Sequence, residues 1–248
     1  MAERRAGRIC LAAILCSVPA INQADCVILL HGLARTSGSM SEVADRLSAE
    51  GYTVVNQDYP SRSERIETLA AQTIDRARTT CEPTSTIHFV THSLGGILVR
   101  YYLTMHKLDQ LGRVVMLAPP NQGSEVVDVW RDVPGFELLN GPAGMQLGTD
   151  SNSVPLTLGP VDFPLGVIAG TATINPILSR SLPDPDDGKV SVQSTQVEGM
   201  QDFIAVPHSH TFIMRSELVQ DQILTFLKTG HFNHNPTKAA DYNVRKTQ

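Results

Sequence analysis

The clearest candidate for chemistry is a serine that follows a short apolar run and precedes an apolar helical segment. It is Ser93, within Thr91-His92-Ser93-Leu94-Gly95. The pattern predicts a strand, a sharp turn and a helix, with the serine in strained backbone angles at the turn. The positions two before and two after it must then be small. Gly95 fits, whereas Thr91 replaces the glycine of the commonest pattern, G-x-S-x-G. A glycine-rich turn before a packing helix is the alternative.

A serine hydroxyl becomes a strong nucleophile when an imidazole takes its proton and a carboxylate orients that imidazole. Two histidines, His208 and His210, stand beyond the last predicted strand. Three aspartates stand in the loop before it: Asp184, Asp186 and Asp187. The same residues could instead bind a metal. However, the two histidines have no third ligand at a defined spacing, so we expect neither a metal site nor a cofactor.

These residues need a scaffold that brings them to one edge. Short, continuous apolar runs predict buried strands at 27–30, 52–56, 87–90, 114–117, 165–169 and 203–206. Helical periodicity predicts helices at 40–50, 64–80, 94–103 and 217–228. Because parallel neighbours require crossover helices, the alternation predicts an α/β fold with a doubly wound, mostly parallel sheet of about six strands. His31, Ser93 and Ala118 then fall at the carboxyl ends of strands, where reactive residues collect.

The rhythm of strand and helix breaks over residues 119–163. Pro, Gly and Asn are frequent there, and the only tryptophan, Trp130, lies in this stretch. We interpret it as an irregular cap or lid over the active site; a surface loop without such a role is the alternative. One catalytic domain is expected over 25–230, followed by a polar C-terminal tail at 231–248.

The N-terminus has a different character. Arg4, Arg5 and Arg8 precede an apolar run at 9–18, and small or turn-forming residues follow as far as Ala24. This layout predicts a signal peptide over 1–24 and therefore export, to the periplasm or out of the cell. An N-terminal strand or helix packed on the domain is the alternative.

Removal of such a signal would leave Cys26 and Cys81 as the only cysteines. An even pair in an oxidising compartment is a candidate disulfide. If the strands near them are neighbours, both cysteines lie at the end of the sheet away from the active site. Two free buried thiols are the alternative.

Composition excludes some classes of partner. The chain has 248 residues, of which 42% are hydrophobic, and a formal net charge of −5. Nucleic acid is not an expected partner of a chain with this charge balance. No apolar run is long enough for a mature transmembrane helix, so we expect no stable membrane insertion after signal removal.

Taken together, these features resemble the α/β-hydrolase family of serine hydrolases. The resemblance covers 27–230 and rests on the serine motif, on His31-Gly32-Leu33 after the first strand, and on the order Ser93, Asp187, His210. It is closest to small bacterial lipases and esterases whose six-stranded sheet lacks the family's first two strands. Asn121-Gln122-Gly123-Ser124 also resembles a segment of bacterial lipases.

The resemblance assigns roles to the candidates. His210 is favoured as the base because the apolar segment 212–214 follows it, and Asp187 is favoured as the acid because Gly188-Lys189-Val190 follows it. His208, Asp184 and Asp186 remain the rivals.

For the oxyanion hole, the resemblance implies the backbone N–H groups of Leu33 and Leu94. His31, Gly32 and His92 are expected beside the substrate, with His31 supporting the oxyanion turn.

The resulting hypothesis is a carboxylesterase that forms an acyl-enzyme on Ser93. The low aromatic content of 5% argues against a large apolar surface patch. It therefore favours short- to medium-chain acyl esters as substrates. A long-chain lipase or an acyltransferase uses the same residues. A catalytically silent binding protein on the same fold is the alternative from another class, and the complete set of Ser, Asp, His and oxyanion turn argues against it.

Overall fold

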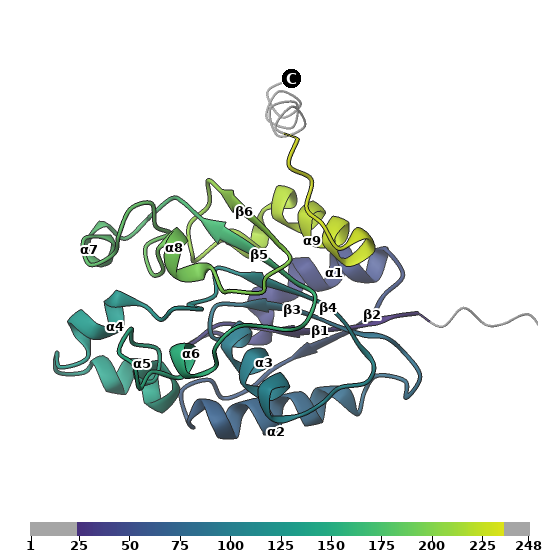
Figure 1. The fold of residues 1–248 in the computed structure, drawn as a ribbon, viewed down its shortest axis with the longest axis horizontal. Coiled ribbons are helices and arrows are strands. Elements are labelled where there is room, and N and C mark those ends of the chain that lie inside the picture. The colour runs from purple at the N-terminus through teal and green to yellow at the C-terminus, as the bar shows by residue number, and fades with distance from the viewer. Residues whose placement is uncertain (1–23, 236–248) are drawn as a thin grey trace, which may run out of the picture.

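A computed structural model describes residues 24–235 (Figure 1). The predicted signal at 1–24 lies outside the described residues, except for Ala24, and so does the tail from residue 236 onward. Within residues 24–235, no helix combines the length and the apolar character needed to cross a membrane.

The centre of the molecule is a sheet of six strands, all of them parallel. Its order is β2-β1-β3-β4-β5-β6. The strands are β1 (Cys26–Leu30), β2 (Thr53–Gln57), β3 (Ile87–His92), β4 (Leu111–Leu117), β5 (Leu165–Gly170) and β6 (Asp202–Val206). The predicted fold class is confirmed, and each predicted strand is found within a few residues of its expected position.

Helices cover both faces of the sheet. The helices α2 (Ile66–Arg78) and α3 (Leu94–Met105) pack on one face, while α1 (Ser41–Ala49) and α9 (Glu217–Thr229) pack on the other (Figure 1). Alternate side chains of β1 point to opposite faces of the sheet. Ile28 and Leu30 pack in the core on the side of α2 and α3, whereas Val27 and Leu29 pack in the core on the side of α1 and α9. A strand that is apolar at every position is thus explained by burial on both faces.

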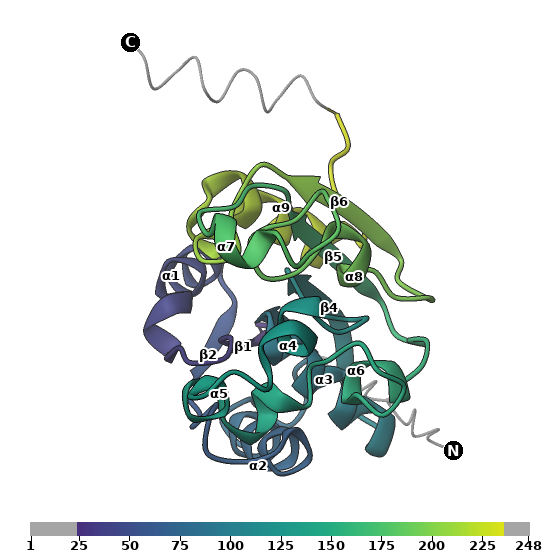
Figure 2. The same cartoon turned by 90° about the vertical axis from the view of Figure 1, so that its left-hand side faces the viewer.

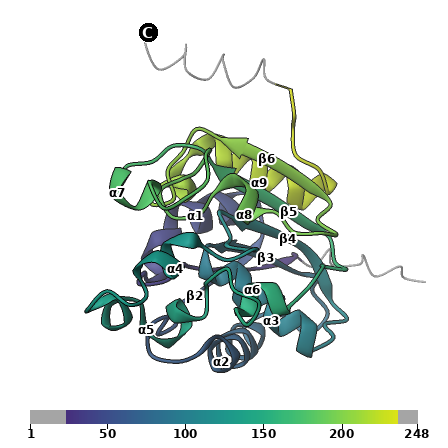
Figure 3. The same cartoon turned by 60° about the vertical axis from the view of Figure 1, so that its left-hand side comes forward.

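The stretch 119–163 is more regular than predicted. It contains three short helices, α4 (Glu125–Trp130), α5 (Phe136–Met145) and α6 (Val154–Thr157), which lie toward the carboxyl ends of the strands (Figures 1 and 3). Gly141, with φ of 65°, and Pro142 kink α5. Proline cannot donate to a helical carbonyl, so short helical pieces replace a long one.

A buried arginine ties this excursion to the core. Arg100, on α3, is 2% exposed and donates to the backbone oxygens of Asn121, at 2.9 Å, and Gly159, at 2.6 Å. Burial lowers the pKa of its guanidinium to about 10, so it stays charged at neutral pH. The two anchored residues lie near the two ends of the excursion, which is therefore fixed at its base.

Cys26 and Cys81 form a disulfide at the amino end of β1. The bond joins the first strand to the segment that follows α2 and closes a loop with a sequence separation of 55 residues. Of the two alternatives left open by the sequence, the structure has the bonded pair.

Loss of this bond should destabilise the fold, because the unfolded chain regains the entropy of the open loop. For the variant Cys26→Ala/Cys81→Ala we expect a free energy of unfolding lower by about 2–4 kcal/mol and a Tm lower by roughly 5–15 °C. Thermal unfolding followed by circular dichroism checks this. Reductant should lower the Tm of the wild type and leave that of the double variant unchanged; equal Tm values for both proteins without reductant would contradict the prediction.

Candidate active site

The turn between β3 and α3 holds Ser93 in an uncommon backbone conformation. Its φ is 53° and its ψ is −120°, a region that non-glycine residues rarely occupy. The Ser93 N–H donates to the Leu117 carbonyl of β4 at 2.9 Å, and its own carbonyl accepts from Gly96 at 2.9 Å. Contacts on both sides thus maintain a conformation that the chain alone would not favour.

Glycines allow the surrounding backbone to approach this turn. A Cβ on Gly95 would lie 2.7 Å from the Leu30 carbonyl oxygen and 2.9 Å from that of His31. A Cβ on Gly32 would lie 3.2 Å from the Ser93 Cβ and 2.7 Å from Nδ1 of His92. The segment 31–33 therefore packs directly against the serine turn, as expected for an oxyanion segment.

Gly95 and Gly96 provide a matched pair for testing this packing. A Cβ on Gly95 collides with rigid backbone of β1, whereas one on Gly96 would meet the flexible Met116 side chain at 3.1 Å. We expect Gly95→Ala to lower the free energy of unfolding by about 1–3 kcal/mol or more, and Gly96→Ala to have the smaller effect. Denaturant unfolding of the two variants measures the difference. Equal losses would mean that β1 does not constrain the turn.

Three side chains form a hydrogen-bonded chain at the carboxyl edge of the sheet. Nε2 of His210 lies 3.0 Å from Oγ of Ser93, and Nδ1 of His210 lies 2.8 Å from Oδ2 of Asp187. Ser93 is 8% exposed, His210 5% and Asp187 1%. The serine is thus in position to pass a proton to an imidazole that a buried carboxylate orients.

The structure distinguishes Asp187 from its rivals. The second oxygen of Asp187, Oδ1, accepts from the backbone N–H of Lys189 at 3.0 Å and of Val190 at 2.8 Å. Asp186 is also buried, but its carboxylate accepts from the Ser179 hydroxyl and the Gly188 N–H, both at 2.6 Å. Asp184 is exposed. Only Asp187 contacts His210, while Asp186 stabilises the loop.

The structure also distinguishes His208 from His210 by their hydrogen-bond partners. Nε2 of His208 lies 2.8 Å from the hydroxyl of Ser216, the residue that precedes α9. His208 therefore serves the start of that helix, and His210 is the histidine beside Ser93.

Replacement of each aspartate by asparagine tests this division of roles. Asp187→Asn removes the acceptor that orients His210, so kcat on an ester substrate should fall by roughly 10³–10⁴-fold. Asp186→Asn weakens two hydrogen bonds of the loop and should mainly lower the Tm. Steady-state kinetics with a melting curve for each variant gives the answer; a larger loss of kcat in Asp186→Asn would reverse the assignment.

His31 is buried under the oxyanion segment. Its Nδ1 donates to the Gly32 carbonyl at 2.9 Å, its Nε2 accepts from the Tyr59 N–H at 3.3 Å, and its ring stacks on that of Tyr59. Burial lowers the pKa of His31, despite the Asp58 carboxylate 3.3 Å away. A neutral imidazole with both nitrogens engaged holds the turn in place.

His92 packs against His210 and hydrogen-bonds to its backbone. Its Nε2 donates to the His210 carbonyl at 2.9 Å, and its ring lies 4.8 Å from that of His210, centroid to centroid. Burial and the nearby His210 hold the pKa of His92 well below its usual value. His92 therefore remains neutral and keeps the tautomer that donates to His210.

The expected oxyanion donors lie on either side of Ser93. Leu94 is the first residue of α3, where backbone N–H groups have no intrahelical partner. Among the described residues, the Leu33 N–H has no hydrogen-bond partner either. A Cβ on Gly144 of α5 would lie 2.9 Å from Cδ2 of Leu33, so α5 covers this turn.

The segment Asn121-Gln122-Gly123-Ser124, for which the sequence predicted no role, supports the loop that carries Asp187. We call this loop, residues 180–191, the acid loop. The Ser124 hydroxyl donates to the Lys189 carbonyl at 2.7 Å, beside Asp187. The Asn121 amide donates to the Thr195 carbonyl at 2.7 Å. Asn121 is fully buried, and a buried amide needs hydrogen-bond partners. This need explains why a polar residue stands here, but the burial is visible only in the structure.

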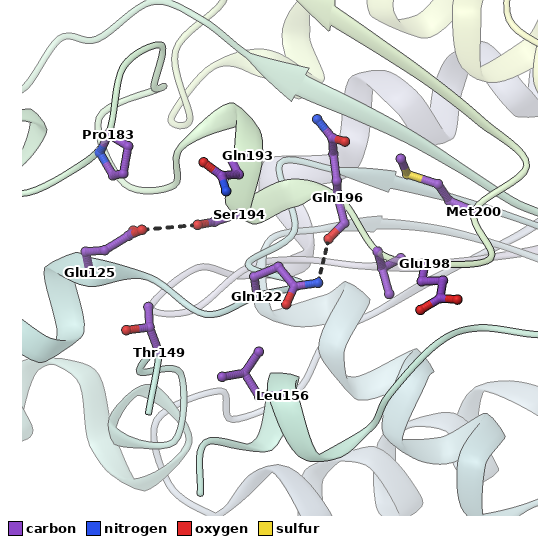
Figure 4. A pocket seen from close by; sticks show the side chains of 11 residues that line it. Gln122, Glu125, Thr149, Leu156, Pro183, Gln193, Ser194, Gln196, Glu198 and Met200 are labelled. Atoms are coloured by element: carbon purple, nitrogen blue, oxygen red, sulfur yellow. Dashed lines mark hydrogen bonds between the residues drawn. The ribbon is translucent and has the colours of Figure 1, made fainter. Parts of the chain in front are cut away.

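A hollow of mixed polar and apolar lining lies behind the acid loop, with Gln122, Glu125 and Ser194 in its wall (Figure 4). Glu125 of α4 accepts from the Ser194 hydroxyl of α8 (Val192–Thr195) at 3.3 Å, and the Gln122 amide donates to the Gln196 carbonyl at 3.1 Å. Among the described residues, no group of three or more His, Cys, Asp or Glu side chains is placed to hold a metal.

Comparison with known proteins agrees with this architecture. A family model described as the alpha/beta hydrolase family matches residues 27–235. The comparison with curated proteins finds no significant match.

Several solved structures share the fold. A lipase from Bacillus licheniformis in its mature form is 18% identical, with a TM-score of 0.61 over 82% of this chain and 92% of that one. A phospholipase from Legionella pneumophila is 18% identical, with a TM-score of 0.65 over 84% of this chain and 59% of that one. A carboxyl esterase from a metagenome is 18% identical, with a TM-score of 0.60 over 77% of this chain and 65% of that one. This chain thus spans most of the lipase and about three fifths of the other two.

Proposed function

Because the chain belongs to the alpha/beta hydrolase family, we propose that it hydrolyses carboxylic esters through an acyl-enzyme on Ser93. The observation that carries the proposal is the unbroken hydrogen-bonded chain from Ser93 through His210 to the buried Asp187. A silent binding protein would have no need for a strained serine turn that presents its hydroxyl to an imidazole.

In the first half of the reaction, Oγ of Ser93 attacks the ester carbonyl carbon while Nε2 of His210 takes the hydroxyl proton. The carbonyl oxygen becomes negatively charged and is stabilised by the N–H groups of Leu33 and Leu94, each worth roughly 3 kcal/mol. Asp187 stabilises the imidazolium through Nδ1–H. The bond to the alkoxy oxygen then breaks, and His210 gives its proton to the departing alcohol.

In the second half, His210 removes a proton from a water molecule, and the hydroxide oxygen attacks the acyl carbon. Collapse of this intermediate breaks the bond to Oγ of Ser93, which recovers its proton from His210. The products are a carboxylic acid and an alcohol. No cofactor or metal takes part in these steps.

We propose short- to medium-chain acyl esters as substrates, with a long-chain lipase as the second candidate. Exposed apolar side chains on α4, α5 and α7 (Pro176–Ser179) support the second candidate, since they lie at the active-site end (Figure 3). They are Val129, Leu138, Leu139 and Ile177. The proposed catalytic domain covers 25–230. Residues 119–163 form its proposed cap, in which α5 packs against Leu33.

We also propose that the protein is exported by the N-terminal segment 1–24. The Cys26–Cys81 disulfide supports this proposal, because such bonds persist in oxidising compartments.

Initial rates on p-nitrophenyl esters from acetate to palmitate, before and after treatment with a serine-directed phosphonate, test the reaction. Ser93→Ala and His210→Ala should lower kcat by roughly 10⁴-fold or more and keep the wild-type Tm, while the control His208→Ala keeps most of the activity. A rate maximum at short chains indicates an esterase, one at long chains a lipase. Undiminished turnover by Ser93→Ala would refute the mechanism.

A further inference from the structure

Three cationic residues stand on the segments that surround His210. Arg35 follows the oxyanion segment and donates to the carbonyl of Thr211, the residue after His210, at 3.4 Å. Lys189 follows the acid, two residues beyond Asp187. Arg215 lies with its guanidinium 5.5 Å from the ring centroid of Phe212. All three come from the loops that carry the proposed triad and oxyanion turn.

These charges are close enough to influence one another. Burial, and then the charge of Arg215, lowers the pKa of Arg35. Desolvation, and then the charge of Arg35, lowers the pKa of Lys189, while Asp187 raises it. Mutual repulsion of this kind is unfavourable unless an anion offsets it.

The carboxylates nearby offset these positive charges only in part. Asp187 is engaged with His210, and Asp58 accepts from the Ser37 N–H at 2.8 Å. Glu42 lies 3.8 Å from Arg215, at the surface. Within residues 24–235, neither Arg35 nor Lys189 has an ion pair, although the whole chain carries a net charge of −5.

A hollow opens beside this group. It has a volume of about 1260 Å³, and its lining comes mainly from α5, from the segment that precedes α1 and from the segment that follows β2. Figure 2 shows where α5, α1 and β2 lie. Its wall includes Arg35, Arg62 and Arg215, together with Leu138 and Leu139 of α5, which are 84% and 64% exposed. The lining holds four arginines, Arg76 included, and one carboxylate, Asp58. The positive charges outnumber the negative one, so the hollow suits an anion beside an apolar chain.

We propose that Arg35 and Arg215 form an anion subsite in this hollow, so that the substrate is an ester whose alcohol part carries a phosphate or a carboxylate. The inference rests on the proposed function. We place the negative charge on the alcohol part of the ester because Arg35 contacts Thr211, the residue after His210. In the proposed mechanism His210 gives its proton to the departing alcohol. Guanidinium groups bind phosphate and carboxylate oxygens through charge-assisted hydrogen bonds.

Two esters of equal acyl chain test the subsite in turnover: a monobutyryl ester of glycerol 3-phosphate and the same ester of glycerol. We expect kcat/KM to be higher for the phosphate ester by about tenfold or more, the effect of one charge-assisted hydrogen bond. Arg35→Gln should bring the ratio of the two values toward unity. The control Lys107→Gln removes a cation that is 90% exposed and pairs with Asp109, and it should leave the ratio unchanged.

Salt gives a second readout of the same ratio. An increase in ionic strength from about 0.1 M to about 1 M shortens the screening length from roughly 10 Å to about 3 Å. The advantage of the phosphate ester should shrink accordingly, while hydrolysis of the neutral ester changes less. A ratio near unity in the wild type, or a ratio that Arg35→Gln does not change, overturns the subsite.

A binding arm separates the subsite from the proposed function. In the Ser93→Ala variant, glycerol 3-phosphate should raise the Tm and glycerol should not, and Ser93→Ala/Arg35→Gln should lose the shift. If no ester is hydrolysed by the wild type but this shift appears, the reaction assignment fails and the subsite stands. Absence of the shift together with a ratio near unity refutes the subsite and leaves the esterase intact.

The anion can belong to a small molecule or to a lipid headgroup, and vesicles distinguish the two sources. We would compare hydrolysis of vesicles of phosphatidylglycerol and of phosphatidylcholine by the wild type and Arg35→Gln. An Arg35-dependent preference for the soluble phosphate ester with no preference among vesicles identifies a small substrate. An Arg35-dependent preference for phosphatidylglycerol identifies a lipid, and no preference in either arm overturns the proposal.

Discussion

The left-handed backbone of Ser93 is the constraint around which the active-site end of the molecule is built. A serine with φ of 53° is unfavourable in isolation, by about 1–3 kcal/mol. The bond from its N–H to Leu117 fixes the turn to β4, and Gly95 lets α3 start close to the carbonyls of β1. The strain therefore depends on the register of three adjacent strands, β1, β3 and β4, in the middle of the sheet.

A second requirement is to bring three distant segments together while giving most of their buried polar groups a hydrogen-bond partner. The acid loop has little regular structure of its own, so hydrogen bonds hold it. Its carboxylate Asp186 stabilises the loop from within, and Ser124 stabilises it from the excursion after β4. The same excursion is anchored by Arg100. Hydrogen-bonded networks of buried polar groups restrict the movement of such a loop, as the proposed role of Asp187 requires.

The sequence was sufficient to predict the sheet because its signals are local. Runs such as Val27-Ile28-Leu29-Leu30 are apolar at every position only when both faces are buried, and the structure confirms this. The choice of Asp187 over Asp186 could only be an expectation, since both are buried and they differ in which neighbour they contact. Likewise, the helices within 119–163 were missed because their propensity is weak and tertiary contacts, such as that of Gly144 with Leu33, decide their conformation.

The net charge of the whole chain also fails to predict the local charge near the proposed triad. A formal charge of −5 describes the average surface, whereas a substrate meets the field of a few side chains in one hollow. Arg35 and Arg215 lie far apart in the sequence, and only the fold brings them to the wall of one hollow. Both are attached to segments that the mechanism must hold rigid. The cations are therefore carried by the same segments as the proposed triad, and a fixed field of this kind would act on the charged ester proposed here without reorganisation of the protein.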